Sequence, residues 1–140
     1  MKVLAAVDGS PFTKRMLAYL AAHEVWLSPD HQYTVLHSVP AVPPRAASMV
    51  EAATLQGYYD DEAEKVFKPL RSFFKRHGVE ATFVAKVGHA ADNIARSADK
   101  GRFDLVVMGS HGHGRLANMV LGSTASKVVA QCGVPVLLIR

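Results

Sequence analysis

The sequence contains one cysteine, Cys132, among its 140 residues. A single cysteine excludes a disulfide within the chain and a C-x-x-C redox pair. No apolar run reaches the length that a membrane-spanning helix requires. The first residues, M-K-V-L-A-A-V-D, also lack the pattern of a secretory signal peptide. We therefore expect a cytoplasmic protein with no membrane segment.

Several motifs of enzymes are also missing. The seven histidines include no H-E-x-x-H zinc motif, and there is no G-x-S-x-G turn for acyl transfer. The P-loop pattern G-x4-G-K-[ST] is absent, and the dinucleotide pattern G-x-G-x-x-G is incomplete. An acidic cluster at residues 60–64 is typical of a solvated helix face. The sequence therefore predicts no catalytic residue and no metal site formed by protein ligands alone.

The charge balance is mildly positive. Lysine and arginine number 16 against 12 aspartates and glutamates, which gives a formal net charge of +4. The basic residues are scattered, and aromatic residues make up 8% of the chain. This pattern argues against nucleic acid as a partner, whereas a small positive excess suits an anionic small ligand.

Apolar segments alternate with helix-compatible segments along the whole chain. Strands are predicted at 2–7, 32–39, 79–87, 103–108 and 134–139, and helices at about 11–27, 49–77, 88–97 and 123–131. Residues 40–48 hold three prolines and are predicted to form a mobile loop without regular structure. This alternation indicates one α/β domain, residues 1–140, with a parallel sheet and helices on both faces.

A glycine-rich stretch joins the fourth predicted strand to the last helix. Gly109, Gly112 and Gly122 lie in it, and Ser123 and Thr124 begin the helix. Glycines allow backbone N–H groups to approach a phosphate closely. The first N–H groups of a helix have no partner within the helix and lie at the positive end of its dipole. This order therefore predicts an anion site, although turn formation alone also favours glycine.

The spacing of these glycines, G-x2-G-x9-G-[ST], resembles the nucleotide-binding motif of the ATP-binding branch of the universal stress protein family. The opening V-D-G-S and the closing G-V-P-V-L-L-I-R also resemble that family, so the similarity covers the chain from Lys2 to Arg140. The resemblance implies a five-stranded sheet of order 3-2-1-4-5. It also implies an adenine-nucleotide site formed by Val7, Asp8, Val39, Met108, Gly109, Gly112, Gly122, Ser123 and Thr124.

Asp8 follows the first predicted strand and should lie opposite Gly109, in the crevice where the strand order reverses. Its carboxylate can accept hydrogen bonds from ribose hydroxyls or hold a divalent cation such as Mg²⁺ beside the phosphates. The alternative is a turn aspartate, because D-G-S-P is also favourable turn chemistry. From the family, Val39 matches the adenine-binding segment, where it would use its backbone groups. His111, His113, Arg115 and Lys127 can neutralise phosphate charge or act as acid–base groups, or can simply face solvent.

The last predicted strand, Val136–Ile139, is apolar throughout and is placed at a sheet edge by the family order. An open apolar edge favours aggregation unless something covers it. Pairing with the same strand of a second subunit around a two-fold axis would satisfy that edge, and the resemblance implies the same dimer.

Together with these patterns, the resemblance implies a stress-response regulator that binds ATP, ADP or AMP and acts as a nucleotide-responsive homodimer. One alternative is a slow ATPase or a nucleotide-using transferase. The other alternative is an interaction module whose pocket is empty. The missing phosphate lysine and the lack of an evident base argue against the enzyme, and the complete glycine motif argues against the empty pocket.

Overall fold

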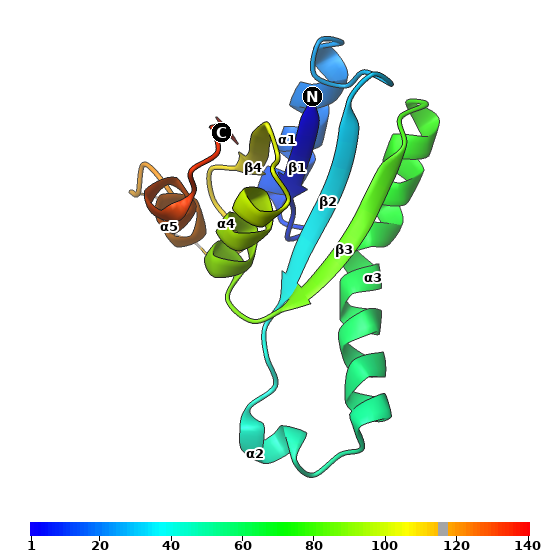
Figure 1. Cartoon of the computed structure of the whole chain (residues 1–140), viewed down its shortest axis with the longest axis vertical. Helices are drawn as coiled ribbons and strands as arrows, with labels where there is room; N and C mark the ends of the chain where they lie inside the picture. The colour runs from blue at the N-terminus through cyan, green and yellow to red at the C-terminus, as the bar shows by residue number, and fades with distance from the viewer. Residues whose placement is uncertain (115–117) are drawn as a thin grey trace.

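The computed structural model describes residues 1–114 and 118–140. Strands and helices alternate along the chain (Figure 1). The strands are β1 (Lys2–Ala6), β2 (Gln32–Val39), β3 (Ala81–Val87), β4 (Leu105–Gly109) and β5 (Val136–Ile139). The helices are α1 (Pro11–Ala22), α2 (Pro44–Ala47), α3 (Ala52–Arg76), α4 (Ala90–Lys100) and α5 (Ser123–Gln131).

All five strands are parallel and form one sheet in the order β3-β2-β1-β4-β5. β1 lies at the centre, where Ala6 pairs with Leu36 of β2 and with Met108 of β4. The chain leaves β1 toward one edge through β2 and β3 and returns to the other side of β1 through β4 and β5. This confirms the predicted fold class and strand order, and it places the topological switch point between β1 and β4.

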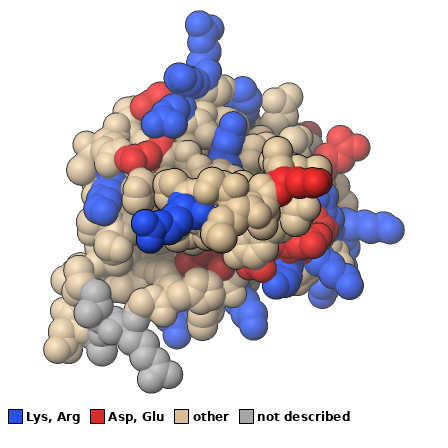
Figure 2. All heavy atoms as spheres, turned by 90° about the horizontal axis from the view of Figure 1, so that it is seen from below, with Lys and Arg blue, Asp and Glu red and all other residues tan. Residues whose placement is uncertain are grey.

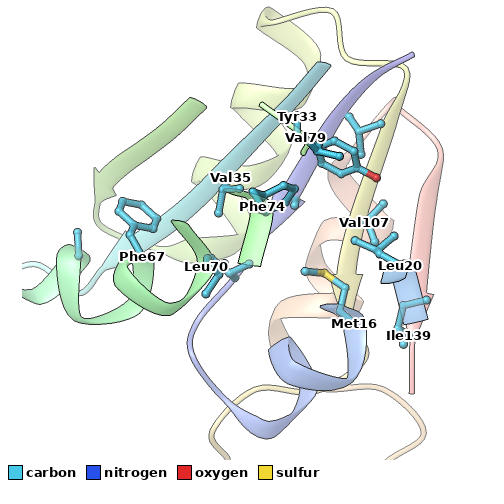
Figure 3. Close-up of a cluster of buried hydrophobic side chains, with 14 of the residues drawn as sticks. Met16, Leu20, Tyr33, Val35, Phe67, Leu70, Phe74, Val79, Val107 and Ile139 are labelled. Atoms are coloured by element: carbon cyan, nitrogen blue, oxygen red, sulfur yellow. The ribbon is translucent and has the colours of Figure 1, made fainter. Parts of the chain in front are cut away.

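The helices cover the sheet in two layers. One core cluster packs α1 and α3 against β1 and β2 and includes Met16, Leu20, Phe67, Leu70 and Phe74 (Figure 3). The second cluster packs α4 and α5 against the opposite face, mainly over β1 and β4. The strands are apolar on both sides where both layers cover them, because neither face meets water.

Several predicted strand and helix ends differ from the structure by two or three residues, and two segments differ more. The prediction that residues 40–48 lack regular structure is wrong, because α2 occupies Pro44–Ala47. Pro44 begins this helix, where a missing N–H group costs nothing and the fixed φ angle is already helical. The first helix ends at Ala22 and not near residue 27, since the chain then makes a turn in which Trp26 N–H donates to the His23 carbonyl oxygen.

No helix among the described residues is both long enough and apolar enough to cross a membrane. Figure 2 shows the end of the molecule toward which β2 and β3 run, with lysines and arginines distributed among acidic side chains and not gathered in one patch. This agrees with the scattered charges expected from the sequence.

Candidate functional site

A pocket lies beyond the carboxyl ends of β1, β2 and β4, at the switch point of the sheet. It encloses about 500 Å³ of space, part of which opens to solvent, and the first turns of α4 and α5 also contribute to its walls. Six of the nine predicted site residues line it, namely Val7, Asp8, Met108, Gly109, Gly112 and Thr124. Val39, Gly122 and Ser123 do not belong to the lining.

Asp8 is held in a fixed orientation by its own turn. Its Oδ1 accepts hydrogen bonds from Ser10 N–H at 2.9 Å and from the Thr13 hydroxyl at 3.0 Å. Its Oδ2 faces Gly112, because a Cβ atom built on that glycine would lie 2.8 Å from it. The turn interpretation and the pocket interpretation therefore describe two oxygens of one carboxylate. Oδ1 organises the turn, and Oδ2 is directed toward the glycine loop.

The three motif glycines are required for three different contacts. None has a positive φ angle, so available space and not backbone conformation selects glycine. A Cβ atom on Gly109 would lie 2.7 Å from Phe12 Cβ, so this glycine allows α1 to pack on β4. A Cβ atom on Gly122 would lie 3.0 Å from His111 Cα and 3.2 Å from the Ser110 carbonyl oxygen. Of the three, only Gly112 would direct a side chain toward Asp8, within the pocket.

The N-terminus of α5 closes the glycine loop at its base. Gly122 caps the helix, and its N–H group donates to the Ser110 carbonyl oxygen at 2.7 Å. Ser110 is fully buried, which fixes this junction in the core. Thr124, in the first turn of α5, lines the pocket. The unpaired N–H groups of this turn therefore lie beside the pocket, as an anion site requires.

Both loop histidines use ring nitrogens to hold the loop. His111 Nε2 donates to the Met119 carbonyl oxygen at 2.9 Å, and its Nδ1 lies 2.8 Å from the Ser110 hydroxyl. His113 Nε2 donates to the Asp8 carbonyl oxygen at 2.7 Å, which ties the loop to the turn after β1. Arg115, predicted to lie near the phosphates, falls outside the described residues.

Ser38 is a pocket residue that the sequence interpretation missed. Pairing of β1 with β2 ends where Val7 N–H donates to the Leu36 carbonyl oxygen at 2.9 Å. The Val7 carbonyl oxygen then accepts a hydrogen bond from His37 Nδ1 at 2.8 Å. Backbone groups alternate between the two sides of a strand, so those of Ser38 face the same side as those of Leu36, beyond the end of β1. Ser38 and His37 both line the pocket.

Val39, one residue further along β2, faces the other way. Its carbonyl oxygen accepts a hydrogen bond from Gly88 N–H at 2.9 Å, on the side of β3, and the residue is 3% exposed. The sequence carried the signal needed to separate the two residues, since alternation along β2 distinguishes them. The missing information was the position at which β1 stops.

Metal ligands do not gather in this pocket. Within residues 1–114 and 118–140, no group of three or more His, Cys, Asp or Glu side chains is arranged to hold an ion. Asp8 is the carboxylate that lines the pocket.

The strand order and the crevice at its switch point define a doubly wound α/β protein with a pocket at the carboxyl ends of its central strands. Residues 1–140 match the universal stress protein family. The chain therefore belongs to the universal stress protein family, as its motifs predicted.

Curated relatives agree with this assignment. Universal stress protein Slr1230 of Synechocystis sp. is 29% identical over 139 residues, which cover 99% of this chain and 42% of that protein. The chain thus spans less than half the length of that relative. A universal stress protein of Thermus aquaticus is 30% identical over 138 residues, which cover 99% of this chain and 97% of that protein.

Solved structures share the fold. UspA from Lactobacillus plantarum superposes with a TM-score of 0.79 at 21% identity, covering 100% of this chain and 97% of that one. An Archaeoglobus fulgidus universal stress protein in complex with dAMP superposes with a TM-score of 0.69 at 22% identity, covering 100% of this chain and 98% of that one. An Arabidopsis thaliana universal stress protein family protein with AMP bound superposes with a TM-score of 0.71 at 17% identity, covering 99% of this chain and 90% of that one.

Proposed function

We propose that this chain binds an adenine nucleotide in the pocket between β1 and β4. The observation that carries the proposal is the order of groups along the pocket. Ser38 belongs to β2, Asp8 follows β1, and Gly112 follows β4, and these three strands are neighbours in that order. The first turn of α5 lies on the Gly112 side, after the glycine loop. A base, a ribose and a phosphate follow one another in the same order in a nucleotide.

The base end fits adenine. A backbone N–H group donates and a backbone C=O group accepts, and both groups of Ser38 face the side on which the pocket lies. Adenine presents an acceptor at N1 beside a donor at N6, whereas hypoxanthine and guanine present the reverse order. The role predicted for Val39 is therefore better suited to Ser38, because the Val39 carbonyl is already bonded to Gly88.

The ribose and phosphate ends fit as well. Asp8 Oδ2 is free of the turn contacts made by Oδ1 and can accept hydrogen bonds from ribose hydroxyls. Unpaired N–H groups at the α5 N-terminus suit the phosphate charge. The role of Ser123 as a phosphate contact rests on its N–H group in that first turn. If Mg²⁺ accompanies a triphosphate, Asp8 is the residue placed to hold it.

Regulation by a dimer remains part of the proposal. β5 lies at the sheet edge beside β4, and Val136–Leu138 are half-buried within one chain. A second copy pairing along Val136–Ile139 would satisfy the open backbone groups of this edge. β4 carries the glycine loop and pairs with β5, so nucleotide occupancy can influence the interface. AMP and dAMP held by similar structures support the nucleotide and leave the preferred phosphate count open.

Isothermal calorimetry with AMP, ADP, ATP and IMP tests the proposal. We expect each adenine nucleotide to bind at least about tenfold more tightly than IMP, since a mispaired donor and acceptor cost roughly 1–3 kcal/mol. Equal affinity for AMP and IMP would show that the backbone of Ser38 does not contact the base. Absence of binding by every nucleotide would instead favour the interaction module.

A further inference from the structure

Part of one sheet face has no helix over it. α1 and α3 pack on one face, and α3 contacts both β2 and β3 there. On the opposite face α4 and α5 cover β1 and β4, and α4 also buries Leu36 of β2. β3 lies uncovered at the edge of this face, beside β2, in Figure 1. The register aligns Leu36 with Val84 and Ser38 with Lys86, so side chains of both strands project from this surface.

A groove lies between this bare surface and α4, with about 900 Å³ of space that opens to solvent. Leu36 lies at its bottom and is already buried under α4, with 1% of its surface exposed. Val84, Phe103 and Thr34 also line it and are half-buried, so they leave surface free. Leu36 lines both this groove and the nucleotide pocket, but the groove extends from there to Gly101 and Phe103, which precede β4, whereas the pocket lies beyond the carboxyl ends of the strands. We name it the β2–β3 groove.

The charged side chains that line the β2–β3 groove are all positive. Lys86 comes from β3, and Arg96 and Lys100 come from α4, one helical turn apart. All three are exposed, and no aspartate or glutamate shares the lining. The two ion pairs formed within the described part of the chain both lie on α3 or its side of the sheet, between Lys65 and Glu62 and between Arg71 and Glu64.

We propose that the β2–β3 groove docks an acidic amphipathic helix of a partner protein. A helix with an apolar stripe covers a sheet face beside a parallel neighbour, as α4 and α5 do on the rest of this face. Apolar side chains of the stripe would meet the free surface of Val84 and Phe103. Aspartate or glutamate residues spaced by four would pair with Arg96 and Lys100, which have the same spacing. The docked helix would complete the layer that α4 and α5 begin.

Other occupants fit less well. A second copy of this chain would bring its own lysines and arginine against the same three cations, and each chain already carries a net charge of +4. A nucleic acid would gain from the three cations but not from the apolar side chain of Val84. Phe103, the aromatic residue in the lining, is already covered by the Lys2 ammonium group at 4.8 Å. An extended peptide strand pairs with a sheet edge, whereas this surface is a sheet face.

A display library of 20-residue helix-forming peptides, with randomised charges around a fixed apolar stripe, tests the proposal on the intact chain. We expect selection to enrich acidic peptides. The best of them should bind at least about tenfold more weakly to an Arg96→Glu/Lys100→Glu variant, because two ion pairs become two repulsions. Arg96→Gln/Lys100→Gln should give an intermediate loss. Lys68→Glu/Arg76→Glu, the same charge change on exposed positions of α3, should alter the affinity less than about twofold.

Amide shifts of the labelled protein locate the selected peptide. Shifts at Thr34, Val84 and Lys86, with the nucleotide affinity unchanged in both groove variants, would support the β2–β3 groove. Three results would overturn the proposal. These are selection that yields no acidic preference, equal loss in the α3 control, and shifts elsewhere on the protein. Binding of a 20-nucleotide RNA that is lost in the groove variants, without any peptide binding, would assign the groove to nucleic acid instead.

Discussion

Replacing Gly112 with alanine places a methyl carbon 2.8 Å from Asp8 Oδ2. That separation is shorter than van der Waals contact, so the carboxylate or the loop must move. The carboxylate cannot move freely, since Oδ1 is bonded to Ser10 N–H and to the Thr13 hydroxyl. Disturbing hydrogen bonds to a charged group costs about 1.5–3 kcal/mol. We therefore expect Gly112→Ala to weaken nucleotide binding by roughly ten- to a hundredfold.

Gly114, two residues further along the loop, provides the matched control. Among the described residues, a Cβ atom there meets nothing within 4 Å, so Gly114→Ala should leave the affinity within about twofold of the wild type. Calorimetry with AMP measures both variants, and thermal unfolding verifies that each is folded. Equal losses at the two positions would indicate a general effect on the loop and would refute the argument from Asp8.

A double-mutant cycle with Asp8→Ala sharpens the test. When the carboxylate is removed, the contact at Gly112 disappears, so the effect of Gly112→Ala should become much smaller. Full additivity of the two substitutions would show that Gly112 acts on the ligand independently of Asp8. The coupling therefore separates a steric role through Asp8 from direct obstruction of a phosphate.

Four further outcomes are expected. Asp8→Ala should weaken nucleotide binding by roughly 1–3 kcal/mol. Calorimetry with and without Mg²⁺ will show whether Asp8 contacts the ribose or the metal. Native affinity in both conditions would show that Asp8 only organises the turn after β1. ATP turnover should be slower than ~1 per second, because both ring nitrogens of His111 and one of His113 are engaged in holding the loop. Faster phosphate release that is lost in His111→Ala would contradict this. Light scattering should give a mass of about twice the 15.1 kDa of one chain, and a monomer at micromolar concentration would exclude pairing through Val136–Ile139. Burial raises the pKa of Tyr33 from 10.0 to about 12. The free energy of unfolding should therefore be unaffected by this group below pH 10 and should fall as the pH rises from 10 toward 12. Tyr33→Phe should remove that decline, and an unchanged pH profile in the variant would rule the group out as its cause.

The fold could be predicted because its signals are local. Continuous apolar runs separated by helix-compatible segments identify a parallel sheet, and the two ends of the chain resemble one family. The helix Pro44–Ala47 escaped prediction because three prolines in nine residues argue strongly for a loop. One of those prolines occupies the first helical position, where its missing donor is harmless.

The candidate site could be predicted at the level of loops but not of individual contacts. The glycine spacing located the loop, yet the reason for each glycine depends on atoms distant in sequence, such as Phe12 beside Gly109. Ser38 was missed for a similar reason. Which residue of β2 turns its backbone toward the pocket depends on where the pairing with β1 ends, and the His37 ring occupies the next acceptor at Val7.

The bond between Gly122 N–H and the Ser110 carbonyl oxygen has a practical use in protein engineering. It anchors the two ends of the glycine loop to a buried junction, so an inserted sequence between them need not displace α5. A fluorophore attached at a cysteine introduced at Gly114 would lie in the loop next to His113, whose ring donates to the Asp8 carbonyl oxygen. Ligand arrival would change its surroundings, and the protein would then report nucleotide concentration as an optical signal.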